Sequence, residues 1–348
     1  MHIQIHIHEQ GFLQHQRHAF SNRFTLVSEL LQNARRAGAT RIELRYDEDR
    51  QLLTVHDNGC GLADFQKLLS LHESGWDADL CASEQPFGVG FMKCLYAATR
   101  CVVQSGRQVV DIDTAAVLAR HPVEVLTVAD TASVPGTRIT LHGINLPGLV
   151  AHVQRLCRGF AVPVWLNGQL LPRPLAEAAL TLHDSAIGRI FLAGQHDGEY
   201  SHDDLVFLQG FCVLEPAWQP GRPVNVVHLD PRIFLARQPD RDRLIDEDLQ
   251  RRRIADALKA CWREVLLAAR GRLPPAVFVE RFYSAMRHWG HLDLLNDLDL
   301  LPLPLVWSIT GYPVQTSWAR WPSPARRLSR PRGRPSRMAR YAWWRWAT

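Results

Sequence analysis

This 348-residue chain lacks the features that mark membrane and secreted proteins. No apolar run approaches the roughly 20 consecutive residues that a membrane-spanning helix needs. The first residues, MHIQIHIH, alternate like a β-strand and have neither the basic start nor the apolar block of a signal peptide. We therefore expect a cytoplasmic protein with no membrane partner.

The seven cysteines are scattered, and no two of them form a Cys-x-x-Cys pair. An odd number without close pairs argues against a disulfide framework and against a zinc site. His2, His6 and His8 alternate near the start of the chain, but no second cluster of metal ligands accompanies them. We expect these histidines to be solvated side chains on an exposed strand.

A predicted helix from about residue 20 to residue 34 carries the first motif. Its apolar residues recur every three or four positions and define one buried face: Phe20, Phe24, Val27, Leu31 and Ala34. Glu29 and Asn33 are spaced i, i+4, so their side chains point the same way. The amide oxygen of Asn33 suits magnesium, and Glu29 could orient and deprotonate a water. The alternative is a solvated polar stripe on an amphipathic helix.

The second motif is Asp57-Asn58-Gly59-Cys60-Gly61, which follows a predicted strand over residues 51–57. An Asp at the end of a strand can accept a hydrogen bond from an exocyclic amine, and that contact selects adenine. Gly59 and Gly61 let the backbone approach a flat ring without a Cβ in the way. The alternative is a plain strand-turn-helix connection.

The third motif is Gly88-Val89-Gly90, directly before a predicted helix over residues 91–98. Free backbone N–H groups and the partial positive charge of a helix N-terminus suit phosphate. The spacing is that of neither a P-loop nor a dinucleotide-binding loop. Lys93, in the first turn of this helix, is expected to point to solvent.

The fourth motif is a predicted strand over residues 137–141, entered by Gly136. A hydroxyl at Thr137 could reach an adenine edge. The alternative is that Thr137 is a structural residue at the start of a strand.

Together, in this order, the four motifs resemble the N-box and the three glycine boxes of the GHKL superfamily, which includes gyrase B subunits, heat-shock-90 chaperones, sensor histidine kinases and MutL-type mismatch-repair proteins. The similarity covers roughly residues 10–175. Residues 20–22, 87–91 and 136–140 look most like the heat-shock-90 branch. Residues 37–39 and 57–61 look more like the MutL branch.

The resemblance implies an α/β (α+β) fold of three parts. Residues 1–175 would form the ATP-binding domain, a Bergerat-type two-layer sandwich of helices and a mixed, mainly antiparallel sheet. Residues 176–290 would form a smaller α/β domain like the transducer or middle domain of the family. Residues 291–348 would be a Pro/Arg/Trp-rich C-terminal extension that is partly disordered.

The resemblance also assigns a role to each motif, with ATP and Mg²⁺ as the bound groups. Residues 63–86 would form a lid over the nucleotide. The remaining roles are Glu29 as general base, Asn33 as magnesium ligand, Asp57 and Thr137 as contacts to adenine, Gly59 and Gly61 as the adenine wall, and Gly88, Val89, Gly90 and Phe91 around the phosphates.

Arg36 departs from the family pattern, because members commonly carry an Asp at this position. Its side chain would either turn outward or contact the phosphates. In both cases the metal site would differ from that of the family, so the resemblance supports ATP binding more strongly than ATP hydrolysis.

The second domain is expected to contain strands over residues 189–192, 205–208 and 224–229. A helix over residues 245–267 would carry its apolar side on Leu249, Ile254, Leu258, Cys261 and Val265. In the family this domain sends a basic residue to the γ-phosphate, and Arg241 and Arg243 are the candidates. The alternative is a solvated charged loop.

Residues 319–348 hold nine Arg and no acidic residue, with aromatic residues interleaved. The chain carries a net charge of +5, so the rest of it carries 5 − 9 = −4. This tail suits nucleic acid through phosphate contacts and base stacking. The alternatives are a disordered segment or a contact with an acidic partner.

The leading hypothesis is a heat-shock-90-like ATPase that uses ATP as a conformational switch acting on a protein client, with ATP-dependent homodimerisation as a family expectation. A MutL-like DNA-transaction ATPase and a non-hydrolysing ATP-binding regulator are the alternatives. We do not expect a sensor kinase, a topoisomerase or a complete heat-shock-90 chaperone, because the further regions that these proteins need have no counterpart in the sequence.

Overall fold

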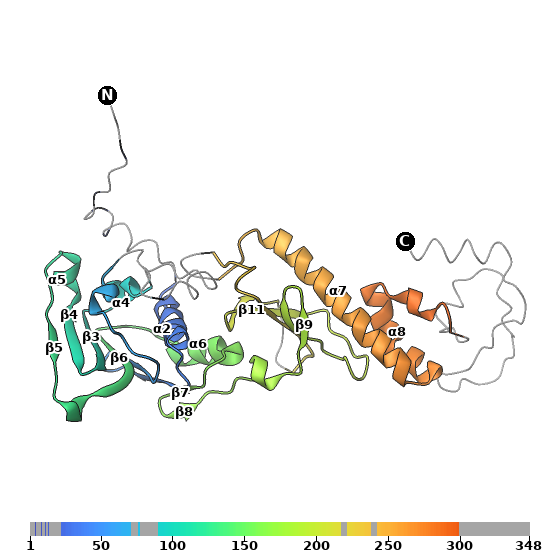
Figure 1. The fold of residues 1–348 in the computed structure, drawn as a ribbon, viewed down its shortest axis with the longest axis horizontal. Coiled ribbons are helices and arrows are strands. Elements are labelled where there is room, and N and C mark those ends of the chain that lie inside the picture. Colours follow the sequence, from blue (N-terminus) through green and yellow to red (C-terminus); the bar gives the residue numbers. More distant parts are fainter. Residues whose placement is uncertain are drawn as a thin grey trace, which may run out of the picture. The chain divides into compact units, whose positions relative to one another are not determined.

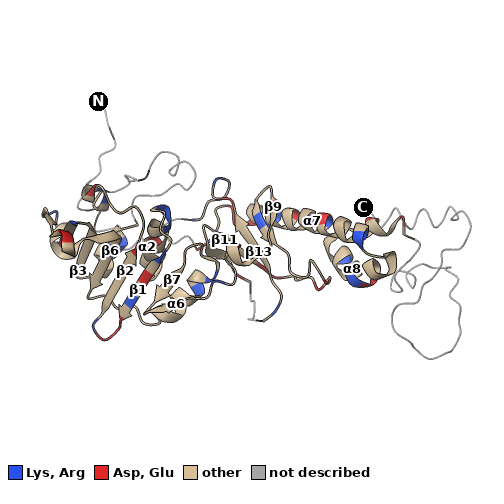
Figure 2. Ribbon diagram, turned by 60° about the horizontal axis from the view of Figure 1, so that its bottom comes forward, with Lys and Arg blue, Asp and Glu red and all other residues tan. Residues whose placement is uncertain are grey.

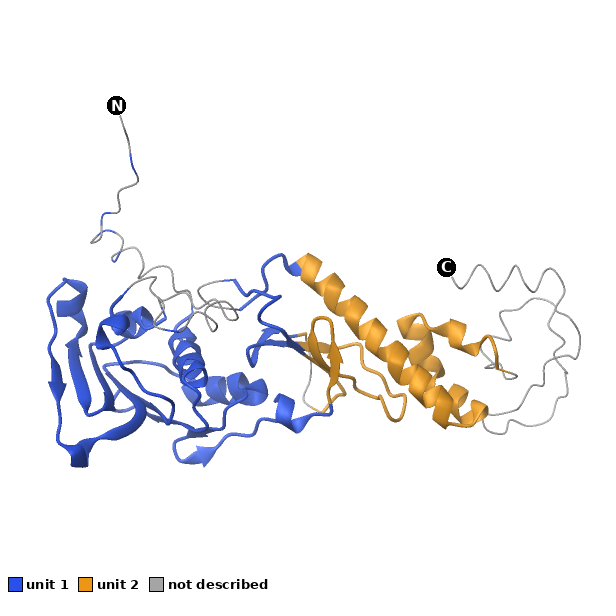
Figure 3. Ribbon diagram, viewed as in Figure 1, with its two compact units in different colours: residues 1–181, 206–215, 228–247 blue, residues 182–205, 216–227, 248–348 orange. Residues whose placement is uncertain are grey.

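The computed structural model describes residues 4, 8, 11, 13, 22–70, 76, 90–216, 221–237 and 242–298 (Figure 1). The chain divides into two compact units, coloured separately in Figure 3. The first unit takes in residues 1–181, 206–215 and 228–247, and the second takes in residues 182–205, 216–227 and 248–348.

An eight-stranded sheet forms the frame of the first unit, with the strand order β5-β4-β3-β6-β2-β1-β7-β8. Among the strands described, β1 and β7 pair in parallel, and every other neighbouring pair is antiparallel. The expectation of a mixed, mainly antiparallel sheet in an α+β protein is therefore confirmed. The strands are β1 (Ile42–Asp47), β2 (Leu52–Asp57), β3 (Arg100–Gly106), β4 (Gln108–Asp113), β5 (Val125–Thr127), β6 (Val134–His142), β7 (Val164–Leu166) and β8 (Gln169–Leu170).

Alternation along β2 decides which of its side chains enter the core. Leu53, Val55 and Asp57 are buried, and the residues between them are half-buried. Because successive strand residues point to opposite faces, these three share one face of the sheet. Asp57 pairs with Thr137 of β6 in the register that also sets Leu53 opposite Leu141. Asp57 therefore stands at the end of an apolar row, where the core meets the turn after β2.

Helices line this buried face of the sheet, and α2 is the central one of them in Figure 1. It buries Leu26, Val27, Leu30, Leu31 and Ala34. The helical elements of the first unit are α2 (Thr25–Arg36), η2 (Phe65–Leu68), α4 (Met92–Ala97), α5 (Thr114–Leu118), η3 (Asp130–Ala132), α6 (Leu149–Leu156), η4 (Cys157–Gly159) and η5 (Glu177–Ala179).

The start of α2 differs from the prediction, because the helix begins at Thr25 rather than near residue 20. A local turn precedes it, in which the backbone N–H of Phe24 donates to Oδ1 of Asn22 (2.9 Å). Asn side chains stabilise such turns in competition with the helix.

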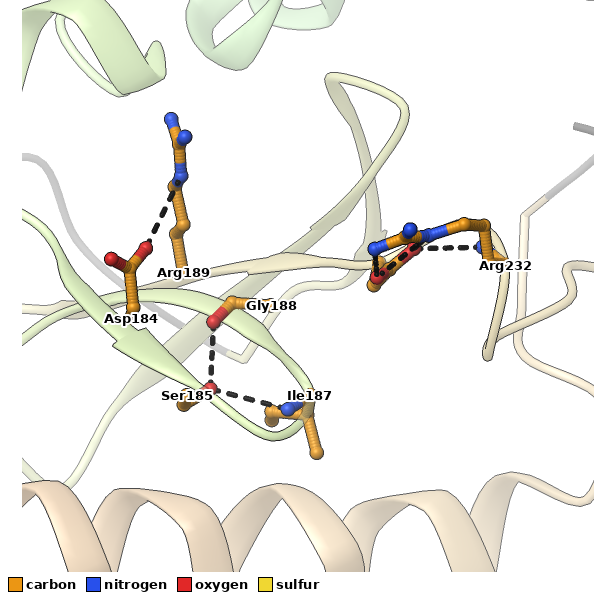
Figure 4. Close-up of polar contacts among 7 residues, drawn as sticks. Asp184, Ser185, Ile187, Gly188, Arg189 and Arg232 are labelled. Carbon is orange, nitrogen blue, oxygen red and sulfur yellow. Dashed lines mark hydrogen bonds and ion pairs between the residues drawn. The ribbon is translucent and has the colours of Figure 1, made fainter. Parts of the chain in front are cut away.

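A second sheet has the strand order β12-β11-β13-β10-β9. Its strands are β9 (His183–Ser185), β10 (Gly188–Phe191), β11 (Asp204–Leu208), β12 (Phe211–Leu214) and β13 (Asn225–Leu229). Figure 4 shows the turn between β9 and β10, where Oγ of Ser185 donates to the carbonyl of Gly188 (2.7 Å) and accepts from the N–H of Ile187 (3.3 Å). This serine therefore holds the hairpin closed. The strands expected over 189–192, 205–208 and 224–229 are all present, with slightly shifted ends.

The helical elements described after the second sheet are α7 (Glu247–Arg272), α8 (Pro275–Trp289) and η6 (Leu292–Leu295). Charged residues of both signs lie along α7 (Figure 2). The predicted apolar face of α7 is correct for Ile254, Leu258, Cys261 and Val265, which are buried, but wrong for Leu249, which is 54% exposed. Leu249 lies five positions before Ile254, which turns its side chain about 140° away from the buried face.

None of the helices in the described part of the chain is both long enough and apolar enough to span a membrane.

Candidate functional site

The C-terminal end of α2 packs against the turn that follows β2, which joins the first motif to the second. The backbone N–H of Cys60 donates to the carbonyl of Ala37 (2.8 Å). A Cβ at Gly59 would lie 2.7 Å from Cβ of Ala37 and 2.7 Å from its carbonyl oxygen. Only glycine fits this approach, so Gly59 keeps the turn close to the helix end.

The Asp57 carboxylate is held by the backbone on two sides. Gly59 N–H donates to Oδ1 of Asp57 (2.8 Å), and the N–H of Thr137 also donates to this carboxylate. The side chain is buried, and this burial raises the pKa of Asp57 above its ordinary value, partly offset by the two backbone donors and by His56. The carboxylate is thus fixed in orientation, and an oxygen has lone pairs left to accept a further hydrogen bond.

The fourth motif reaches the second at Gly136. This residue has a φ of +64°, and a Cβ there would overlap the carbonyl oxygen of Asp57. A serine that sequence reasoning missed completes the junction: Oγ of Ser105 donates to the carbonyl of Gly136 and accepts from the N–H of Leu62, both at 2.8 Å. Ser105 lies on β3, outside all four motifs, and no local pattern in the sequence marks it.

Glu29 joins the first motif to the third. Its side chain is buried, with 7% of the residue exposed, and a Cβ at Gly90 would overlap its Oε2. The alternative of a solvated polar stripe is therefore wrong for Glu29. The Glu29 charge also reaches Cys94 of α4, whose thiol pKa rises to about 12, mainly through burial and further through this carboxylate. Glu29 consequently faces the glycine that precedes α4 and the first turn of that helix.

Lys93 is buried, with 4% of the residue exposed, so the expectation that it points to solvent is wrong. Its positive charge acts on Cys94 in the direction opposite to Glu29, lowering the pKa of the thiol. The helix α4 contains six residues, and the first four of them, Lys93 included, are buried. A buried cation therefore stands at the start of the helix that was predicted to receive phosphate.

Asn33 and Arg36 occupy the middle and the end of the same face of α2. Arg36 is buried, with 8% exposed, so its outward orientation is excluded. Its Nη1 donates to Oδ1 of Asn33 over 3.4 Å. Arg35 behaves differently, because its Nε donates to Oε1 of Gln32 on the neighbouring side of the helix (2.9 Å). Glu29, Asn33 and Arg36, at i, i+4 and i+7, thus form one polar row along α2.

This arrangement does not fit a magnesium ion on Asn33. The predicted ligand atom, Oδ1 of Asn33, already accepts a hydrogen bond from a guanidinium, and a divalent cation would be repelled by the positive charge beside it. The described residues also contain no group of three or more His, Cys, Asp or Glu side chains that could hold a metal ion elsewhere.

Several predicted site residues lie outside the described part of the chain. These are Gly88, Val89, Arg241, most of the predicted lid (residues 71–75 and 77–86), His2, His6, and the basic tail. Phe91 is the N-cap residue of α4. Arg243 is described: its side chain is 64% exposed and forms a 3.9 Å ion pair with Asp242, which favours the solvated loop at this position.

The chain matches no protein-family model and no curated protein sequence. The resemblance to the GHKL superfamily therefore rests on the four motifs alone.

Proposed function

We propose that the first unit is an ATP-binding domain of the GHKL type, with the Bergerat arrangement of sheet and helices. One observation carries this proposal: residues from all four motifs, far apart in the sequence, lie together in pairs. Ala37 contacts Gly59, Thr137 donates to Asp57, and Glu29 abuts Gly90. The contacts of Asp57 lie where β2 ends beside Thr137 of β6, two central strands of the sheet, and a shared binding site would account for this meeting of motifs.

Asp57 is the proposed adenine anchor. The exocyclic amine of adenine is a hydrogen-bond donor, whereas guanine carries a carbonyl oxygen at the corresponding position. An ionised carboxylate accepts from the amine and repels the oxygen, so we expect adenine nucleotides to bind and guanine nucleotides to be rejected. Gly59 and Gly61 leave the adjacent backbone without a Cβ, which suits a flat base.

Glu29 is the proposed general base for hydrolysis. A water oxygen would form a bond to the γ-phosphorus while the bond from that phosphorus to the β,γ-bridging oxygen breaks, leaving ADP with the electron pair. The Glu29 carboxylate would take the proton that the water loses. The closeness of Glu29 to Gly90, the last glycine of the predicted phosphate turn, supports this role.

The test of the proposal is calorimetric titration of the full chain with ADP, ATP and GTP, comparing wild type with Asp57→Asn. We expect ADP and ATP to bind, GTP to bind at least about tenfold more weakly, and the variant to lose at least about tenfold in ADP affinity, as expected for a buried charge-assisted hydrogen bond. Equal binding of ADP and GTP, or an Asp57→Asn variant that folds and binds ADP normally, would overturn the proposal.

A non-hydrolysing ATP-binding regulator is the second candidate, and the Arg36–Asn33 contact favours it, because the arrangement lacks the metal site that hydrolysis in the family would use. The wider proposals are a cytoplasmic, heat-shock-90-like switch acting on a protein client and an ATP-dependent homodimer. A MutL-like role with the basic tail on nucleic acid is the remaining alternative, and its signature would be strongly salt-dependent DNA binding.

A further inference from the structure

The polar row on α2 places a guanidinium beside Asn33, the residue to which the GHKL resemblance assigns the nucleotide's metal ion. Glu29 meets Gly90 near one end of the row, and Ala37, the residue after Arg36, meets Gly59 beyond the other end. Asn33 lies between them, and the Arg36 side chain folds back along the helix so that Nη1 reaches Oδ1 of Asn33. The guanidinium therefore lies between the residues that face the predicted phosphate turn and those that face the predicted base.

A buried guanidinium in this position can do electrostatically what a divalent cation does. It carries a permanent positive charge and five N–H donors in a planar fork, a geometry that matches phosphate oxygens. Nη1 donates to Asn33, and a guanidinium can bridge an amide oxygen and a phosphate. Lys93, also buried, supplies a second cation at the start of α4. Two buried cations thus lie on the elements that carry the first and third motifs, together with the Glu29 carboxylate.

We propose that this chain binds the phosphates of its nucleotide with Arg36 in place of a divalent cation, so that nucleotide binding does not require magnesium. This inference rests on the proposed function. Asn33 then acts as a positioning residue, since its amide oxygen holds the guanidinium instead of a metal ion.

The experiment titrates the full chain with ADP in excess MgCl₂ and, separately, in excess EDTA. We expect the wild-type affinity in EDTA to lie within about threefold of the affinity in magnesium, because the guanidinium supplies the charge in both buffers. Arg36→Gln should weaken ADP binding in EDTA by about tenfold or more, the loss expected for a charge-assisted hydrogen bond. Arg35→Gln, a change of the same kind on the adjacent residue, should leave the affinity unchanged.

Adenosine binding distinguishes a direct contact between Arg36 and phosphate from a merely structural role, because a structural defect would weaken adenosine binding as well as ADP binding. Adenosine has the base but no phosphate, so Arg36→Gln should bind it as wild type does. An equal loss of adenosine and ADP affinity would show that Arg36 only supports the fold, and would overturn the inference.

Two results separate failure of this inference from failure of the proposed function. If ADP binds wild type only with magnesium, and Asn33→Ala removes that binding while Arg36→Gln does not, the inference is wrong and the nucleotide site stands. If ADP binds in neither buffer, the proposed function itself is wrong, and the inference falls with it. If Arg36→Gln fails to fold, the comparison of wild type in the two buffers remains decisive. Arg36→Lys, which keeps the positive charge, then serves as the second variant.

Discussion

The carboxylate of Glu29 lies so close to Gly90 that a Cβ on the glycine would overlap Oε2. This contact joins the first motif to the third and sets the carboxylate beside the segment that precedes α4. The glycine leaves room for the carboxylate, and the proposed role of Glu29 as general base depends on that position.

Gly90→Ala is expected to displace Glu29 and to cost about 1–3 kcal/mol of unfolding free energy, the usual range for overpacking in a filled site. Phosphate release from ATP should fall with it, since the carboxylate moves. Urea denaturation and a phosphate-release assay measure the two effects. Gly271→Ala is the matched control, because a Cβ at Gly271 meets nothing within 4 Å and the change lies in helix α7. Gly271→Ala should be neutral or slightly stabilising. If Gly90→Ala were as stable and as active as Gly271→Ala, the packing described for Glu29 would be contradicted.

Glu29→Gln should separate nucleotide binding from turnover. Gln has nearly the same shape but cannot accept the proton from water, so ADP affinity should stay within about threefold while phosphate release falls by about 100-fold or more. Steady-state phosphate release in magnesium and in EDTA, beside calorimetric ADP binding, measures both. Wild-type turnover no greater than that of the variant would leave a nucleotide-binding module without hydrolysis.

Asp57 should make stability depend on pH in a direction opposite to that of an ordinary ion-paired carboxylate. Its folded pKa is raised by burial above the ordinary value of 3.8, so the folded state binds the proton more tightly than the unfolded state. The unfolding free energy therefore falls as pH rises from about 3.8 through the raised folded pKa, and is constant above it. Urea denaturation across this range should show a smaller fall in Asp57→Asn than in wild type, and part of the fall should remain because burial also raises the pKa of Asp204. Parallel curves for the two proteins would contradict the assignment.

The same titration should appear in binding. Protonation of Asp57 removes the ionised acceptor for the adenine amine, so ADP affinity should decline on acidification with a midpoint above 3.8, the ordinary pKa of an Asp. Adenosine should follow the same pH profile as ADP, because the effect concerns the base and not the phosphates. A decline seen only with ADP would point to the phosphate end of the site instead.

Cys60 offers a footprint for the proposed nucleotide site. It is exposed in the turn between Gly59 and Gly61, whereas Cys94 and Cys157 are buried with thiol pKa values raised to about 12. Iodoacetamide at neutral pH should therefore alkylate Cys60 and spare Cys94 and Cys157, since thiolate is the reacting form. Saturating ADP should slow alkylation of Cys60 several-fold, as followed by peptide mass spectrometry. GTP is the control, and equal rates with and without ADP would argue against a nucleotide next to this turn.

Local sequence pattern was sufficient for most of the secondary structure. The strand predicted over residues 51–57 is present as β2, and the helix predicted over residues 91–98 is present as α4, with shorter ends. The boundaries were less predictable. The side chain of Asn22 stabilises a turn that delays the start of α2, and such competition between a cap and a helix is settled by small energies.

Exposure of individual polar residues was the least predictable property. The general rule that charged residues stay in water predicts an outward side chain for Lys93 and allows one for Arg36 as one of two alternatives. Both residues are buried, and Arg36 donates a hydrogen bond to Asn33.

Local periodicity and residue type were enough to predict the order of the four motifs, the glycine positions where a backbone must approach closely, and the shared face of Glu29 and Asn33. The packing of separate elements was needed to show that Glu29 meets Gly90, that Ser105 ties Gly136 to the turn after β2, and that a guanidinium donates to the amide oxygen of Asn33. These contacts join residues on different elements or depend on which rotamer a packed side chain is forced to adopt, and no local pattern encodes either.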